Sequence, residues 1–94
     1  REEGIHYVSE LLRETRSDDA LSVGASPRAG LMLLMAAKSF ARFAGRDFVI
    51  PDDIQQAFLP VMRHRVVLSP STELEGITAD EVLENLLEAI EVPR

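Results

Sequence analysis

The apolar segment from Pro27 to about Ala44 constrains the fold more than any other part of the sequence. Leucine, methionine, phenylalanine and alanine occupy nearly every direction around the helix that this segment predicts. Lys38, Ser39 and Arg42 are the main interruptions. A helix that is apolar nearly all round has to be covered by its neighbours. We therefore expect this helix to form the centre of a small helical bundle.

The residues at the start of this segment indicate where the helix begins. Ser26 is a good N-cap, because its hydroxyl accepts a hydrogen bond from a free N–H of the first turn. Pro27 suits the first helical position, where its missing N–H costs nothing. Arg28 opposes the helix dipole, whose positive end favours acidic side chains. The residues alone leave two interpretations of Arg28: a side chain that turns to solvent or pairs with an acid, and an anion site at the helix start.

Amphipathic patterns at both ends of the chain predict helices that cover the central one. Residues 2–16 place apolar side chains on one face at helical spacing. These are Ile5, Val8, Leu11 and Leu12, with His6 and Tyr7 at the edge of the face. The last helix begins at the capping-box pattern of Thr78 and Glu81, and an apolar stripe follows over residues 82–90.

A third helical segment follows the central one. Pro51, Asp52 and Asp53 suit a first turn, because proline fits the first position and the positive end of the dipole favours acids. Asp52 and Asp53 are therefore interpreted as helix charges and not as an acid–base pair. Pro60 has no N–H and clashes with the preceding turn of a helix, so we expect a break near Leu59.

Two short β-prone runs, residues 48–50 and 66–68, lie on either side of the third helical segment. We expect them to pair as a minimal two-strand ribbon that needs the helices for its stability. Residues 17–24 and 69–76 are expected to be loops. The predicted fold class is all-α: a small helical bundle with at most this ribbon, in a single domain.

The net charge of −6 is unevenly distributed along the chain. Residues 28–65 carry six basic and three acidic side chains, whereas residues 66–94 carry one basic and seven acidic side chains. An acidic chain lacks the broad basic surface that nucleic-acid binding requires, so we expect no nucleic-acid partner. Lys38, Arg42 and Arg46 are interpreted as a stripe that is either solvated or caps the negative end of the central helix dipole.

Residue patterns typical of catalysis or metal binding are missing from the sequence. His6 and His64 are far apart and cysteine is absent, so no metal site is expected. A glycine-rich loop that ends in Lys-Ser or Lys-Thr, which would cradle a triphosphate, is also missing. No apolar run approaches the roughly 20 residues that cross a bilayer, so we expect no membrane span. We expect the chain by itself to turn over no substrate.

Several motifs follow one another along the chain. They are Gly-Ala-Ser-Pro-Arg-Ala at residues 24–29, Gly-Arg-Asp-Phe-Val-Ile-Pro-Asp-Asp-Ile at residues 45–54 and Arg-His-Arg-Val-Val-Leu at residues 63–68. With the first helix from Tyr7 and the ending Val92-Pro93, they closely resemble the C-terminal lid domain of MoxR-type AAA+ ATPases. The resemblance covers essentially the whole chain. It departs at Ile50, where the family often has a threonine that caps the next helix.

The resemblance implies that residues 1–94 are one lid domain, cut from a longer ATPase. Arg28 matches the family's sensor-two arginine, a catalytic side chain that reaches the phosphates of ATP. The cofactors implied for the intact parent protein are ATP and Mg²⁺. By analogy with other lids, Gly24, Tyr7 and Val8 border the adenine. The nucleotide would be bound mainly by an αβα domain that precedes the lid, so we expect none on the chain alone.

The same resemblance implies partners and a location. Neighbouring subunits would form a ring, usually a hexamer, in which ATP hydrolysis changes the angle of the lid. MoxR proteins act as chaperone-like remodellers, often with a partner that contains a von Willebrand A domain. The expected location is the cytoplasm.

Two alternatives of other classes follow from the same residues. A long central helix, the run 48–50 and the helix start at Pro51 resemble a histone-like interaction module, which would dimerise through its central helix. A helix-turn-helix DNA-binding domain would need a basic recognition helix, and the helices predicted here are mostly apolar or acidic. The size of the isolated chain in solution discriminates between the first alternative and a monomeric lid.

Overall fold

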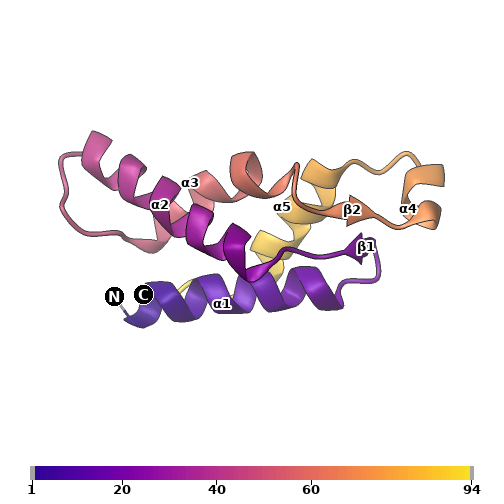
Figure 1. The fold of residues 1–94 in the computed structure, drawn as a ribbon, viewed down its shortest axis with the longest axis horizontal. Coiled ribbons are helices and arrows are strands. Elements are labelled where there is room, and N and C mark those ends of the chain that lie inside the picture. Colours follow the sequence, from indigo (N-terminus) through magenta and orange to yellow (C-terminus); the bar gives the residue numbers. More distant parts are fainter. Residues whose placement is uncertain (1, 94) are drawn as a thin grey trace.

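Five helices and a two-strand ribbon make up residues 2–93, the part of the chain that the computed structural model describes (Figure 1). The helices are α1 (Glu2–Ser17), α2 (Pro27–Phe43), α3 (Pro51–Met62), α4 (Pro70–Leu74) and α5 (Ala79–Ala89). The strands are β1 (Leu21–Val23) and β2 (Val67–Leu68). The domain is elongated and measures 43 × 22 × 21 Å. The predicted all-α bundle with a minimal ribbon is confirmed.

Helix α2 begins and ends where the sequence predicts. The Ser26 hydroxyl accepts a hydrogen bond from the N–H of Ala29 over 3.3 Å, and Pro27 is the first residue of the helix. At the other end, Gly45 adopts a φ of +81°, and its N–H donates to the carbonyl of Arg42 over 2.9 Å. A glycine in this left-handed conformation closes a helix at little cost. Local chemistry therefore sets both ends of α2.

One face of α2 is buried and the opposite face is exposed. The buried face is a row of small and apolar residues at helical spacing, Ala29, Leu33, Ala37 and Ala41. It packs against α1 and α3, as Figure 1 shows. Leu31, Met35 and Phe43 on the exposed side are 62%, 63% and 91% exposed. The prediction that neighbours cover α2 nearly all round is therefore wrong, and an apolar strip remains on its surface.

The core fills the space between α1, α2, α3 and α5 (Figure 1). Its largest fully buried apolar side chains are Tyr7, Leu11, Leu33, Ile54, Phe58, Met62 and Leu83. In α1, Val8, Leu11 and Leu12 are buried as predicted, but Ile5 is exposed and Tyr7 is buried in its place. The apolar face of α1 is therefore rotated towards Tyr7.

Helix α3 continues past Pro60 to Met62, so the predicted break near Leu59 is wrong. A proline at this position removes the hydrogen bond to the carbonyl of Gln56. Both Pro60 and Gln56 are exposed, so this carbonyl is on the side of the helix that faces water. On the opposite side, Phe58 and Met62 are buried in the core, and their packing stabilises the last turn.

The ribbon forms from a different pair of segments than predicted. Strand β1 pairs with β2 in antiparallel orientation, with Leu21 opposite Leu68 and Val23 opposite Val67. Residues 48–50 form no strand, because Ile50 is the N-cap of α3. The segment predicted as a loop after β2 contains the short helix α4, which begins after Ser69. Within the described residues, none of the helices has the length and apolar composition that a bilayer crossing requires.

Candidate anion site at the start of α2

The last turn of α1 holds the backbone just before α2. The hydroxyl of the buried Thr15 donates a hydrogen bond to the carbonyl of Leu12 over 2.6 Å and accepts one from the N–H of Ala25 over 2.9 Å. The Arg16 guanidinium donates from Nη1 to the carbonyl of Ala25 over 3.3 Å. Both backbone polar groups of Ala25 are therefore bound by α1, and Ser26 follows directly.

Two glycines allow this close approach of α1 and α2. A Cβ atom on Gly24 would lie 2.6 Å from the carbonyl oxygen of Thr15 and 2.7 Å from the backbone of Arg16. A Cβ atom on Gly30 would lie 2.5 Å from a methyl carbon of Leu12. Only glycine fits beside the α1 backbone at position 24. The way α1 crosses α2 thus determines the position of the first turn of α2, which contains Arg28.

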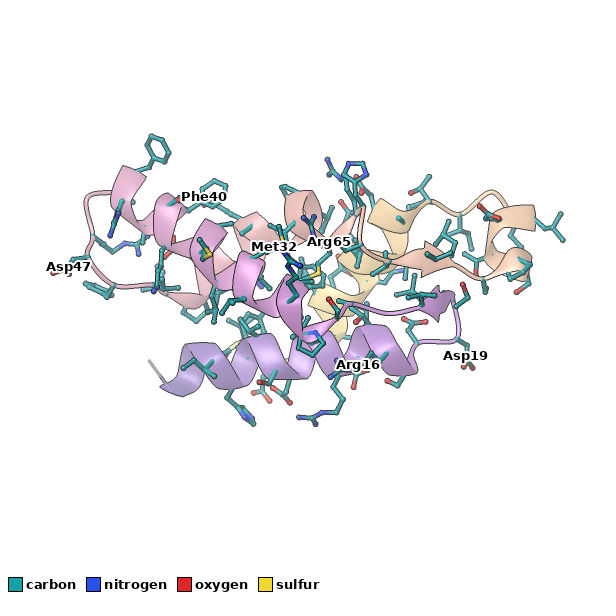
Figure 2. The ribbon with its side chains drawn as sticks, in the orientation of Figure 1. Arg16, Asp19, Met32, Phe40, Asp47 and Arg65 are labelled. Atoms are coloured by element: carbon teal, nitrogen blue, oxygen red, sulfur yellow. The ribbon has the colours of Figure 1, made fainter. Side chains whose placement is uncertain are left out.

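A cavity of about 360 Å³ lies at the start of α2. Its lining residues come from the segment 23–32 and from the connection after α3: Val23, Gly24, Ser26, Arg28, Ala29, Met32 and Arg65. Figure 2 shows Met32 and Arg65 beside each other. Two of the predicted site residues, Gly24 and Arg28, therefore lie together, and the fold adds Arg65 to them.

The cavity carries two positive charges and no acidic side chain. Within the described residues, the exposed Arg28 guanidinium makes no hydrogen bond or ion pair. This excludes an acidic partner for Arg28 in that part of the chain. Arg65 is exposed and uses Nη1 to donate one hydrogen bond, over 2.9 Å, to the carbonyl of Val61. Two guanidinium groups without acidic partners at one cavity are suited to bind an anion.

Tyr7 and Val8 lie apart from this cavity. Their exposed fractions are 0% and 4%, and both belong to the hydrophobic core. In this structure neither side chain offers surface to a base, and their contact with adenine stays a prediction.

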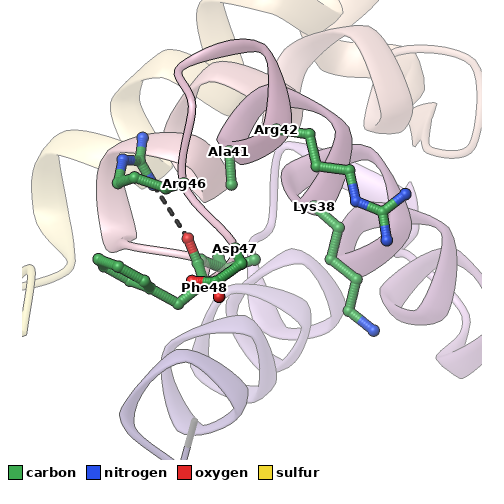
Figure 3. A pocket seen from close by; sticks show the side chains of 7 residues that line it. Lys38, Ala41, Arg42, Arg46, Asp47 and Phe48 are labelled. Atoms are coloured by element: carbon green, nitrogen blue, oxygen red, sulfur yellow. Dashed lines mark hydrogen bonds between the residues drawn. The ribbon is translucent and has the colours of Figure 1, made fainter.

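The opposite end of α2 contains an arginine in a closed site. Arg46 binds both carboxylate oxygens of Asp53, over 2.7 and 2.8 Å, and donates to the carbonyl of Phe48 over 3.0 Å. Figure 3 shows Lys38 and Arg42 pointing away from Arg46 and Phe48. Of the two interpretations of Arg46, the solvated one is therefore wrong, because its guanidinium binds Asp53.

Asp53 explains why this pair forms. Its side chain is only 3% exposed, and it also accepts a hydrogen bond from the N–H of Ile50 over 2.9 Å. That bond caps α3, which Ile50 cannot cap with its own side chain. The hydrogen bonds from Arg46 hold the pKa of Asp53 below its usual value, against the effect of burial. The same contact raises the pKa of Arg46.

The family becomes clear when the chain is compared with known proteins. The sequence model of the AAA lid domain matches residues 13–86. This chain belongs to the AAA lid domain family. Its relatives include proteins named MoxR, so the resemblance to MoxR-type ATPases is confirmed. The family match favours the lid domain over the histone-like alternative.

Three relatives illustrate how the lid domain corresponds to longer proteins. YeaC, an uncharacterized protein of Bacillus subtilis, is 37% identical over 87 residues, which are 93% of this chain and 27% of YeaC. Chaperone MoxR1 of Mycobacterium tuberculosis is 33% identical over 99 residues, covering 96% of this chain and 26% of MoxR1. The crystal structure of a candidate ATPase from Cytophaga hutchinsonii superimposes with a TM-score of 0.90 at 30% identity, covering all of this chain and 31% of that one.

The lid domain spans between 26% and 31% of the length of these three proteins. The sequence alone indicates Arg28 as a site residue of this domain and assigns no role to Arg65. The only signal was that Arg65 belongs to the motif of residues 63–68. No spacing along the chain links that motif to the start of α2, because the β1–β2 pairing brings the two segments together.

Proposed function

We propose that this lid domain supplies Arg28 to the phosphates of ATP bound on an ATPase domain of the same protein, in the role of a sensor-two arginine. The observation that carries this proposal is the Arg28 guanidinium at the first turn of α2, exposed and without an acidic partner in the described residues. An arginine placed there opposes the helix dipole and does not stabilise the fold. A phosphate in front of the helix start attracts both the guanidinium and the free N–H groups of the first turn, and this attraction offsets the repulsion.

The proposed site is divided between two domains. The lid contributes positive charge, and the αβα domain that precedes it contributes the main contacts to ATP and Mg²⁺. Because the chain has no glycine-rich phosphate loop of its own, it is expected to bind little nucleotide alone. Gly24 would lie next to the nucleotide, with Tyr7 and Val8 supporting this side of the lid from the core.

An apolar strip next to Arg28 supports the docking of another domain. Leu31, Met32 and Met35 on α2 are exposed, and Met32 also lines the Arg28 cavity. Exposed apolar side chains that adjoin one another are typical of protein–protein contacts. We assign this strip to contact with the ATPase domain and, in a hexameric ring, with neighbouring subunits. Chaperone-like remodelling in the cytoplasm, with a von Willebrand A-domain partner, completes the proposed role.

Replacing Arg28 in the intact ATPase tests the proposal. Arg28→Ala should lower the turnover at saturating ATP on the order of 100-fold, the effect of removing one charge-stabilising donor from a transition state. Its melting temperature should not change, because Arg28 has no partner in the described residues. Arg42→Ala is the matched control, since Arg42 is an exposed arginine on the same helix. Unchanged turnover in Arg28→Ala would refute the sensor-two role.

A further inference from the structure

We infer that Arg65 is a second anion-binding residue of this site and contacts the same triphosphate group as Arg28. This inference rests on the proposed function, because it takes the ligand of the cavity to be a nucleoside triphosphate. The first argument is position. Arg28 belongs to the start of α2 and Arg65 to the connection after α3, yet both line one cavity of about 360 Å³.

The second argument is the unbalanced charge of the cavity. Two guanidinium groups that line one cavity repel each other, and none of the residues that line the cavity is acidic. Two of the other arginines in the described residues have acidic partners: Arg46 binds Asp53, and Arg63 binds Asp80. An anion with several oxygens relieves the repulsion, because each guanidinium offers a fork of N–H donors to it.

The third argument is that Arg65 is oriented before any ligand binds. Its backbone N–H donates to the carbonyl of Met62 over 2.8 Å, and its Nη1 donates to the carbonyl of Val61 over 2.9 Å. Both acceptors belong to the end of α3. One nitrogen of the guanidinium is thus anchored, and its other N–H groups make no hydrogen bond within the described residues. A pre-oriented side chain loses less conformational entropy when the ligand arrives.

The nearby Arg63 provides a control for the experiment. It lies two positions before Arg65 and is also exposed, but it donates from Nε and Nη2 to the two carboxylate oxygens of Asp80, each over 3.0 Å. It is absent from the lining of the Arg28 cavity. Arg63→Ala therefore removes the same charge from the same connection without removing a group from the proposed site.

The test measures nucleotide affinity and turnover in the intact ATPase. Arg65→Ala should weaken the binding of a non-hydrolysable MgATP analogue, measured by calorimetry, about tenfold, the usual effect of losing a charged hydrogen bond. Arg65→Lys should recover part of the affinity, because it keeps the charge but loses the fork. In the Arg28→Ala background, Arg65→Ala should change the affinity by a different factor than in the parent protein, because both residues bind one group.

The outcomes separate this inference from the proposed function. If Arg65→Ala binds the analogue as Arg63→Ala does, while Arg28→Ala is impaired, the inference about Arg65 is overturned and the sensor-two role of Arg28 stands. If Arg28→Ala and Arg65→Ala both behave as Arg63→Ala does, both fail. A loss of affinity in Arg65→Ala that Arg65→Lys does not relieve, together with a lower melting temperature, would indicate a structural role and overturn the inference.

Discussion

The two ends of α2 carry arginines in opposite circumstances. At the C-terminal end, Arg46 binds both oxygens of the buried Asp53, which in turn caps α3. At the N-terminal end, Arg28 lines a cavity without an acid and has no partner in the described residues. The residue type is the same, and the presence of an acid within reach decides what it does.

The helix dipole enhances this difference. A positive side chain beyond the last turn of α2 is favoured by the negative end of the helix, and one in the first turn is disfavoured by the positive end. The dipole therefore adds to the contacts that stabilise Arg46, whereas Arg28 has no partner among the described residues. A side chain that costs the fold a little stability and stays unpaired is a candidate for function.

Loss of Arg46 should give the largest change in stability. Arg46→Ala leaves the Asp53 carboxylate buried, with the N–H of Ile50 as its remaining partner among those described. Because an unpaired buried charge is strongly unfavourable, we expect the melting temperature to fall by roughly 10 °C. Circular dichroism, recorded while the lid domain is heated, measures this fall in melting temperature.

Arg28→Ala is the control for Arg46→Ala, because it removes the arginine at the other end of α2. Arg28→Ala, measured in the same way, should melt within about 2 °C of the parent, since surface changes without partners alter stability little. An equal fall in melting temperature in both variants would show that Arg28 stabilises the fold as Arg46 does. The two ends of α2 would then not differ in this respect.

Gly24→Ala should give the next largest effect. The new Cβ would lie 2.6 Å from the carbonyl oxygen of Thr15, so the start of α2 has to move away from α1. Overpacking of this kind costs about 1–3 kcal/mol of unfolding free energy, which denaturant titration measures. In the intact ATPase, turnover should fall as well, because Arg28 moves with the helix.

Gly4→Ala is the matched control for Gly24→Ala. Its Cβ would lie 3.7 Å from a methyl carbon of Ile54, which is an ordinary contact, and alanine favours the helix in which Gly4 lies. This variant should therefore be as stable as the parent or more so. If Gly24→Ala is equally well tolerated, the close approach of the two helices is not what positions Arg28.

The pH dependence of stability should give the smallest effect. The folded state holds the pKa of Asp53 below its usual value, so the pair stabilises the fold fully above the ordinary carboxyl range of about pH 4. Below that range the unfolded chain takes up a proton that the folded chain does not, and the stabilisation is lost. The stability difference between the parent and Asp53→Asn should shrink as the pH falls below about 4.

Urea titrations of both proteins at several pH values measure this difference. Arg46 stays charged throughout the range, so the titration of Asp53 accounts for the change. A difference that stays constant down to pH 2 would show that the Arg46–Asp53 pair does not depend on the charge of the carboxylate.

Much of the fold was predictable because its signals are local. The cap at Ser26, the end of α2 at Gly45 and the capping box of Thr78 and Glu81 all occur as predicted. Each depends on hydrogen bonds or backbone angles within a few residues. The failures at Pro60 and in the ribbon have a different origin. There, packing of α3 and pairing of distant strands override what each short segment prefers.

The sequence by itself determined that α2 starts at Pro27 and that Arg28 lies in its first turn, because cap chemistry is local. It also carried the motifs by which the family is recognised. Only the tertiary structure decided that Asp53 closes the site of Arg46, that Tyr7 is buried and that Arg65 lines the same cavity as Arg28. Those outcomes depend on how α1 crosses α2 and on which strands pair. Contacts between segments distant in the chain leave no periodic signal in the sequence.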